Sequence, residues 1–292
     1  MEKGLIVFRN YREADYEAVC DFLIELNQKD RAHINWNWAR FEWMSEHAEF
    51  DKSAASSIGL WWSAGRIVGA AIYDMYFGEA FCGVLPEYAA LYPELLAYAY
   101  DAMKDETGLA IAICDGNTAE IEAANRAGFL PIEQTETIME IDLDMPREAA
   151  LPNGFSLYEP DPVQDAEALQ WLFWQGFDHG EDRAEFEREE TDAPQVRKHL
   201  RRELGIAAVD RTGEYVAFCC LWFSEKTDYA YVEPVCTIPR HRGKGLAKAL
   251  LFEAMNRARA LGAKTAYVIS DMPFYEKLGF RKAYHYTFYK KA

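Results

Sequence analysis

RHRGKGLA, at residues 240–247, is the stretch of this sequence that decides the fold. An apolar run at residues 229–237 precedes it and predicts a buried strand, which Pro239 ends. An amphipathic segment at residues 244–261 follows, with apolar side chains recurring at helical spacing. The pattern therefore predicts a glycine-containing turn that connects a buried strand to the first turn of a helix.

This turn has the properties of an anion site. Backbone N–H groups at a helix N-terminus have no partner within the helix, and the helix dipole adds partial positive charge there. Gly243 and Gly245 remove the Cβ atoms that would hold a phosphate group away. Five of the nine residues 240–248 are Arg, Lys or His, although the chain has 48 acidic against 31 basic residues. The contrast favours a phosphate-bearing ligand, and the alternative is a basic helix start with ordinary turn glycines.

The turn fits neither the GxxxxGK[ST] loop of nucleotide hydrolases nor the GxGxxG turn of dinucleotide-binding folds. Residues 242–247 match Arg/Gln-x-x-Gly-x-Gly/Ala, the hallmark that follows the fourth strand in the GNAT superfamily of N-acetyltransferases. About 30 residues later, FYEKLGF at residues 274–280 resembles the Tyr-x-x-x-Gly-Phe helix that lies beside the cofactor thiol in that superfamily. By these two motifs the second half of the sequence resembles a GNAT acetyltransferase.

The resemblance implies which residues hold the cofactor, acetyl-CoA. Backbone groups of the fourth strand are expected to pair with the thioester carbonyl and the pantetheine amides, here at Val235, Cys236 and Thr237. The expected diphosphate-binding residues are Arg242, Gly243, Lys244, Gly245, Leu246 and Ala247. Pro234 has no N–H to donate to a sheet, so it predicts a bulge or splay that opens a slot, with a plain strand irregularity as the alternative.

Two side chains are candidates for the chemistry. Tyr275 is predicted to be the general acid for the departing thiolate, because a phenol with a pKa of about 10 stays protonated at neutral pH. Its alternative role is that of a packed aromatic. Glu233 is a candidate general base, directly or through water, and its alternative role is to attract a cationic substrate or to pair with a basic neighbour. Cys236 is expected to be a small buried side chain rather than an acetyl carrier.

The sequence also repeats weakly at an offset of about 150 residues. Three landmarks recur in the same order, namely strand starts at Phe8 and Phe155, turns at Gly65 and Gly213, and helix ends at Gly128 and Gly279. A segment rich in chain-breaking residues, between Pro146 and Gly154, predicts a linker. We therefore expect two tandem GNAT-like domains, at residues 1–148 and 149–292, each a central mixed sheet flanked by helices, in the layout of mycothiol synthase.

The two halves differ in the residues that carry the motifs. Where the first half should hold its phosphate loop, residues 86–93 contain no arginine and no glycine, and Ala124 stands where the second half has Tyr275. The first domain is therefore predicted to have lost its diphosphate site. In the second half, strands are predicted at residues 155–158, 205–210, 214–223, 228–237, 265–269 and 283–290, and helices near 163–176, 194–203, 244–261 and 272–278.

Charge and cysteine usage limit the other functions. A formal net charge of -17 disfavours binding to nucleic acid or an anionic membrane and suits a cationic partner, although acidic surfaces also simply keep proteins soluble. No apolar stretch reaches the roughly 18 residues of a membrane span, and no leader is visible, so we expect a cytoplasmic protein. The six cysteines lie mostly in apolar runs and the six histidines lack paired ligand spacing, so no metal is expected.

The function indicated is direct transfer of the acetyl group of acetyl-CoA to a primary amine of a small molecule. The alternatives are acetylation of a peptide or protein amine, and a regulator that binds acetyl-CoA without turnover. The acidic stretch at residues 178–192 is either a solvated face or a means to recruit a cationic amine. The aromatic residues Trp36, Trp38, Phe41 and Trp43 are predicted to pack in the core, with a substrate cleft between the domains as the alternative.

Overall fold

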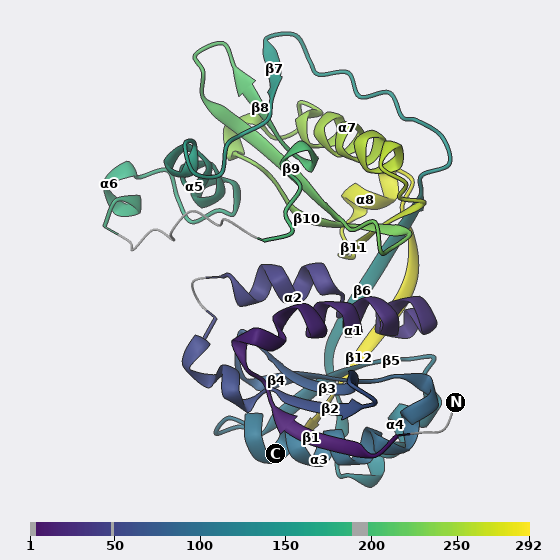
Figure 1. Cartoon of the computed structure of the whole chain (residues 1–292). Helices are drawn as coiled ribbons and strands as arrows, with labels where there is room; N and C mark the ends of the chain where they lie inside the picture. Colours follow the sequence, from purple (N-terminus) through teal and green to yellow (C-terminus); the bar gives the residue numbers. More distant parts are fainter. Residues whose placement is uncertain (1–3, 48–49, 189–197) are drawn as a thin grey trace. The chain divides into compact units, whose positions relative to one another are not determined.

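Figure 1 shows the chain as a computed structural model, which describes residues 4–47, 50–188 and 198–292. The chain divides into two compact units. Unit 1 consists of Met1–Met139, Ile269–Asp271 and Lys282–Ala292, and unit 2 consists of Glu140–Val268 and Met272–Arg281. Both units are mixed α/β structures, and each is described below by itself.

Unit 1 is a mixed sheet with helices on both faces. Its paired strands are, in spatial order, β1 (Ile6–Asn10), β2 (Gly59–Ser63), β3 (Arg66–Asp74), β4 (Tyr76–Val84), β5 (Leu109–Cys114) and β12 (Arg281–Lys291). Only the β4–β5 pair is parallel. The helices are α1 (Tyr16–Lys29), α2 (Trp38–Ser45), α3 (Tyr92–Met103) and α4 (Thr118–Arg126). Helices α1 and α3 both pack against β3 (Figure 1), and the seven inner residues of β3 are buried, as expected for a strand covered on both faces.

Most of the C-terminal strand, β12, belongs to unit 1. β12 pairs antiparallel with β5, from Tyr286 opposite Cys114 to Lys291 opposite Leu109. β6 (Leu130–Asp142) starts in unit 1 and ends in unit 2, so the units meet at residues 139 and 140 and are not contiguous in sequence. This division differs from the sequence-based boundary at 148/149. An alternating pattern predicts a strand and its buried face but does not specify which sheet the strand joins.

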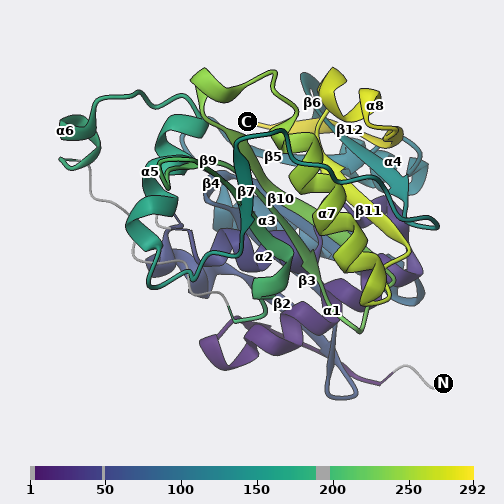
Figure 2. The ribbon, with the colours of Figure 1, turned by 90° about the horizontal axis from the view of Figure 1, so that it is seen from above.

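Unit 2 repeats the mixed arrangement. Its strands, in spatial order, are β11 (Thr265–Ile269), β10 (Tyr229–Thr237), β9 (Tyr215–Phe223), β8 (Gly205–Asp210) and β7 (Phe155–Tyr158), with only the β10–β11 pair parallel. Its helices are α5 (Ala166–Gly176), α6 (Arg183–Phe186), α7 (Leu246–Ala260) and α8 (Pro273–Lys277). Helices α5 and α7 both lie against β9 and β10, and α7 runs beside β10 in Figure 1 and Figure 2.

The internal repeat predicted from the sequence is confirmed at two of its landmarks. Gly128 and Gly279 both follow a helix with positive φ, +87° and +98°. In each case the N–H three residues beyond the helix donates to a carbonyl of the last turn, Phe129 to Ala124 and Phe280 to Tyr275. Gly65 and Gly213 likewise have positive φ in the turns before β3 and β9. In both units a glycine with positive φ therefore ends a helix, and another lies in the turn between two antiparallel strands.

Two expectations about the chain as a whole can also be compared with the structure. The six cysteines are all buried and none forms a disulfide, as predicted from their position in apolar runs. Within residues 4–47, 50–188 and 198–292, no helix combines the length and the apolar character needed to cross a bilayer. The helix predicted at residues 194–203 lies partly outside the described residues, and its described end contains only the short 3-10 helix η5 (Arg202–Leu204).

Candidate active site

The end of β10 is open on one side. β10 pairs with β11 only from Tyr229 to Tyr231, whereas its pairing with β9 continues to Thr237. The register against β9 shifts between Val232 and Val235, at the place of Pro234. The bulge predicted from Pro234 is therefore confirmed. Residues 235–237 pair with β9 along one edge, but along the other edge they do not pair with β11.

The turn after β10 owes its shape to two glycines. After the short 3-10 helix η6 (Pro239–His241), Gly243 and Gly245 have φ of +75° and +83°, a region that side chains with a Cβ rarely adopt. Gly245 is the N-cap of α7 and supplies no side chain to cap it. A Cβ built on either glycine meets no protein atom within 4 Å. The space in front of the turn is therefore open to a ligand.

The backbone N–H groups of this turn are unpaired. The first hydrogen bond of α7 runs from the N–H of Ala249 to the carbonyl of Gly245, at 3.1 Å. Among the described residues, no acceptor receives a hydrogen bond from the N–H groups of residues 243–248. Gly243, Lys244 and Gly245 are exposed. Six adjacent donors thus lie without an acceptor at the N-terminus of a helix of 15 residues.

The arginines of the motif are bound to the protein itself. Arg242 donates from Nε to the carbonyl of Thr237 at 3.0 Å and from Nη2 to the carbonyl of Gly176 at 2.9 Å, and it forms an ion pair with Asp178 at 2.9 Å. Arg240 donates to Gln175 at 2.9 Å and pairs with Glu214. The five basic residues of the turn therefore offer a ligand less positive charge than their number indicates, because Arg240 and Arg242 are already paired and hold the turn in place.

The remaining positive charge comes from two lysines. Among the residues that the structure describes, Lys244 and Lys248 have no carboxylate partner, and both are exposed. The Nζ atom of Lys244 lies 3.2 Å from Nδ1 of His241. Partial burial, with the neighbouring charges of Lys244 and Arg240, lowers the pKa of His241. His241 is thus neutral at pH 7 and acts as a hydrogen-bonding neighbour rather than a third positive charge.

The end of α5 packs closely on β10. A Cβ at Gly176 would lie 2.8 Å from the Sγ of Cys236, so only glycine permits this approach. Cys236 is buried, and burial raises the pKa of its thiol to about 12. The thiol therefore stays protonated at neutral pH, consistent with the packing role expected for Cys236. Gly176 was not predicted from the sequence, because its contact partner lies 60 positions away in the chain.

Tyr275 lies in a buried aromatic cluster. Its ring makes edge contacts with Phe274 and Phe280, at centroid distances of 5.0 and 5.3 Å, and the residue is 7% exposed. Burial raises the pKa of Tyr275 above its usual value, and the nearby Cys219 and Glu233 raise it further. Glu233 is half-buried, and its carbonyl accepts a hydrogen bond from Nε1 of Trp222 at 2.8 Å. The structure thus brings both predicted catalytic side chains into one neighbourhood.

The acidic stretch after α5 is largely engaged within the protein. Asp178 pairs with Arg242, Asp182 accepts from the N–H of Ala184 at 2.8 Å at the start of α6, and Glu187 pairs with Arg183 at 3.0 Å. These contacts favour the structural role over recruitment of an amine. Glu190 and Asp192, which complete the stretch, lie outside the described residues.

Unit 1 has a different turn at the equivalent place. β4 is followed by the 3-10 helix η4 (Pro86–Leu91), in which no residue has positive φ. Glu87 of this segment pairs with Lys29 at 2.7 Å and with Arg66 at 3.1 Å. In unit 1 the basic side chains near this turn are thus neutralised by Glu87. In unit 2, by contrast, Lys244 and Lys248 have no carboxylate partner among the described residues.

The family is indicated by direct comparison. Residues 166–280 match the model of the acetyltransferase (GNAT) family. This segment of unit 2 is therefore similar to the GNAT acetyltransferase family. The matched range runs from the start of α5 through the glycine turn to Phe280, so it contains the whole site described above.

Individual relatives agree with this assignment. The chain is 29% identical over 106 residues to an uncharacterised N-acetyltransferase, YhbS, of Escherichia coli K12, covering 33% of this chain. It is 33% identical over 94 residues to a glucosamine 6-phosphate N-acetyltransferase of Trypanosoma brucei brucei, covering 28% of this chain. The alignment spans 64% of the length of each of these curated relatives.

Solved GNAT structures share the fold of the whole chain. A tandem GNAT protein from the clavulanic acid biosynthesis pathway superposes with a TM-score of 0.64 at 17% identity, covering 98% of both chains. A GCN5-related N-acetyltransferase from Sphaerobacter thermophilus gives a TM-score of 0.59 at 17% identity, covering 98% of this chain and 95% of that one. The tandem GNAT fold predicted from the sequence is therefore confirmed.

Proposed function

We propose that unit 2 transfers the acetyl group of acetyl-CoA to a primary amine of a small molecule, by direct transfer. The observation that carries the proposal is the row of unpaired N–H groups at residues 243–248, in front of which the two glycines leave open space. The GNAT match over the same residues supports it. Unit 1, whose equivalent turn lacks these features, is proposed not to bind the cofactor diphosphate.

The residues present fit coenzyme A. The amides of residues 243–248, with Lys244 and Lys248, would hold the diphosphate, and the free edge of β10 at residues 235–237 would receive the pantetheine amides. The hydroxyl of Thr237 is buried and without a hydrogen-bond partner among the described residues, so it is a further polar atom available at this edge. When bound, acetyl-CoA supplies a thioester carbonyl that an amine can attack.

The proposed reaction forms a C–N bond and breaks a C–S bond. Glu233 takes a proton from the amine, directly or through a water molecule, and backbone N–H groups at the bulge of β10 polarise the carbonyl oxygen. Tyr275 donates its phenolic proton toward the departing sulfur. Its raised pKa makes it a weaker acid than an ordinary phenol, so we expect its main contribution to be a hydrogen bond to the developing thiolate.

A small amine is favoured over the other acceptors by two observations. One relative of this chain is, by its name, an N-acetyltransferase for glucosamine 6-phosphate, a small molecule. The net charge of -17 favours the approach of a protonated amine over that of an anionic partner. Acetylation of a peptide amine and cofactor binding without turnover are the alternatives that the following experiment separates.

Release of free coenzyme A thiol from acetyl-CoA is measured with the full chain against panels of small amines and of peptides. We expect turnover with small amines and a loss of about 100-fold in kcat for Glu233→Gln, as for removal of a general base. Glu225→Gln, which removes an exposed carboxylate of the same unit, is the control and should leave kcat unchanged. Turnover only with peptides, or tight acetyl-CoA binding without any turnover, would contradict the proposal.

The pH dependence of kcat offers a further test. Because burial raises the pKa of Tyr275, its phenol remains protonated throughout the neutral and mildly alkaline range. Loss of the proton donor is therefore expected only above about pH 10, and kcat should not fall as the pH rises from 6 to about 10. A descending limb near pH 8 to 9 that disappears in Tyr275→Phe would show that the phenol titrates earlier and is not shielded as described.

A further inference from the structure

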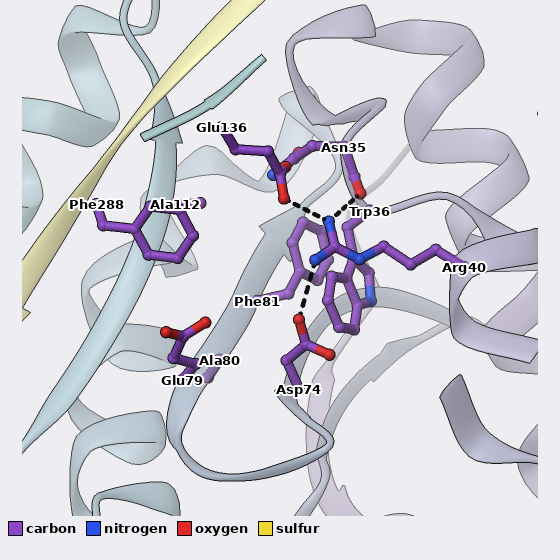
Figure 3. A pocket seen from close by; sticks show the side chains of 10 residues that line it. All are labelled: Asn35, Trp36, Arg40, Asp74, Glu79, Ala80, Phe81, Ala112, Glu136 and Phe288. Atoms are coloured by element: carbon purple, nitrogen blue, oxygen red, sulfur yellow. Dashed lines mark hydrogen bonds and ion pairs between the residues drawn. The ribbon is translucent and has the colours of Figure 1, made fainter. Parts of the chain in front are cut away.

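Lys244, in the turn after β10, has an imidazole as its neighbour where other basic side chains have a carboxylate. In unit 1, for comparison, the guanidinium of Arg40 donates to Asp74 at 2.9 Å and to Glu136 at 3.0 Å (Figure 3). Among the described residues Lys244 has no carboxylate partner, and its Nζ atom lies 3.2 Å from Nδ1 of His241. The side chain of Lys244 therefore has a proton acceptor beside it and no anion that holds its proton in place.

The imidazole of His241 is positioned as that acceptor. Its ring makes an edge contact with Phe155 of β7, at a centroid distance of 5.4 Å. Partial burial, with the charges of Lys244 and Arg240, lowers the pKa of His241, so the ring is neutral at pH 7. Because an ammonium group only donates, Nδ1 carries the lone pair and Nε2 carries the ring proton. His241 can therefore take up a proton from Lys244.

Lys248 provides an internal comparison for Lys244. Both lysines are exposed, both lie in the segment of unpaired N–H groups, and neither has a carboxylate partner among the described residues. The Nζ atom of Lys248 lies over the ring of Phe252, 5.5 Å from its centroid, and a phenyl ring takes up no proton. An amine attacks an acyl group only in its uncharged form, so a base beside it raises its reactivity. Lys244 is thus expected to be the more nucleophilic of the two.

The same turn attracts an anionic acyl donor. The N–H groups of residues 243–248 have no acceptor among the described residues, and a Cβ built on Gly243 or Gly245 meets no protein atom within 4 Å. A small acyl phosphate combines a phosphate, which these N–H groups can bind, with an acetyl group attached directly to that phosphate. The thioester of acetyl-CoA, by contrast, is separated from its diphosphate by the pantetheine arm. An acyl phosphate is therefore the donor that suits a lysine within the turn.

We propose that Lys244 is a site of acetylation by a small acyl phosphate, with His241 as the base. The uncharged Nζ attacks the acetyl carbonyl, so that a C–N bond forms and the C–O bond to phosphate breaks. The proton of the attacking nitrogen passes to Nδ1 of His241 and then to water, and hydrogen phosphate leaves with a proton from water. Acetylated Lys244 has lost its positive charge. The consequence rests on the proposed function, because Lys244 is one of the two lysines proposed to hold the cofactor diphosphate, so acetylation lowers the affinity for acetyl-CoA.

Incubation of the full chain with acetyl phosphate tests the modification site, and fragmentation mass spectrometry of a peptide that contains both lysines gives their relative rates. We expect Lys244 to be acetylated about tenfold faster than Lys248, as for assistance by a general base. The two rates should become equal in His241→Asn, whose amide takes up no proton. His285→Asn changes a histidine of unit 1 that pairs with Asp115 and should keep the original ratio. Equal rates in the unaltered chain, or an unchanged ratio in His241→Asn, would overturn the proposal.

The effect on the cofactor site is measured separately. Lys244→Gln has a neutral amide, as the acetylated side chain does, and should raise the Kd for coenzyme A about tenfold in calorimetry, the loss expected for one charged hydrogen bond. An unchanged Kd would overturn the regulatory consequence. Selective acetylation of Lys244 in a chain that binds no coenzyme A would support the modification site and contradict the proposed function. Binding of coenzyme A together with equal acetylation of both lysines would overturn the modification site alone.

Discussion

Replacing Gly245 by valine is expected to raise the Kd for acetyl-CoA about 100-fold or more. Gly245 has φ of +83°, where a β-branched residue is strained by about 1 to 3 kcal/mol, so the turn should abandon this conformation. The amides of residues 243–248 then leave the positions they hold in this turn, and each charge-assisted hydrogen bond lost to a phosphate costs about 1.5 to 3 kcal/mol. Affinity is measured by calorimetry with acetyl-CoA and with coenzyme A.

The matched control for this change is Gly65→Val. Gly65 has nearly the same φ, +81°, and a Cβ there also meets no atom within 4 Å, but it lies in the β2–β3 turn of unit 1. The Gly65→Val variant imposes the same backbone strain and should lower the stability of the protein without changing the Kd for acetyl-CoA. An unchanged Kd in Gly245→Val, or equal losses in both variants, would remove the turn from the cofactor site.

Replacing Tyr275 by phenylalanine is expected to lower kcat about 100-fold and to leave the KM for acetyl-CoA within about twofold. The variant keeps the ring contacts with Phe274 and Phe280 and loses only the hydroxyl. Removing one hydrogen-bond donor aimed at a developing charge costs about 10² to 10³ in rate. Steady-state rates of thiol release give kcat and KM separately.

Tyr73→Phe provides the comparison for this loss. Tyr73 is also buried, with a pKa raised mainly by burial, but its hydroxyl donates to the carbonyl of Asp51 in unit 1. Its removal should affect stability alone. If Tyr275→Phe retained full kcat, the phenol would be a packing residue, which was the alternative drawn from the sequence.

Local features of the fold were predictable because local residues cause them. Predicted strands at 155–158, 205–210 and 265–269 coincide with β7, β8 and β11, since alternating or continuous apolar runs bounded by turn residues leave little choice. Pro234 predicted the bulge in β10, because a residue without an N–H cannot continue a ladder. Gly279 predicted the end of α8, because a left-handed C' position favours glycine.

Features that depend on distant partners were not predictable. The sequence shows that Arg240 and Arg242 are basic, but only the fold shows that Glu214 and Asp178 pair with them. The role of Gly176 depends on Cys236 in another element, and the pairing of β12 depends on the open edge of β5. The backbone part of the proposed cofactor site could be predicted from the sequence, because Gly243 and Gly245 mark a turn whose backbone conformation favours glycine.

The pairing of β12 with β5 limits where the protein chain can be truncated. A fragment starting at residue 149 would retain the glycine turn and Tyr275, yet its last strand would be left with exposed N–H and C=O groups where Leu109–Cys114 pairs in the full chain. The complementary fragment, ending at residue 148, would leave β5 with an equally bare edge. Deleting the half without a phosphate turn is therefore expected to yield a product that aggregates. That half would then be required for solubility whether or not it binds a ligand.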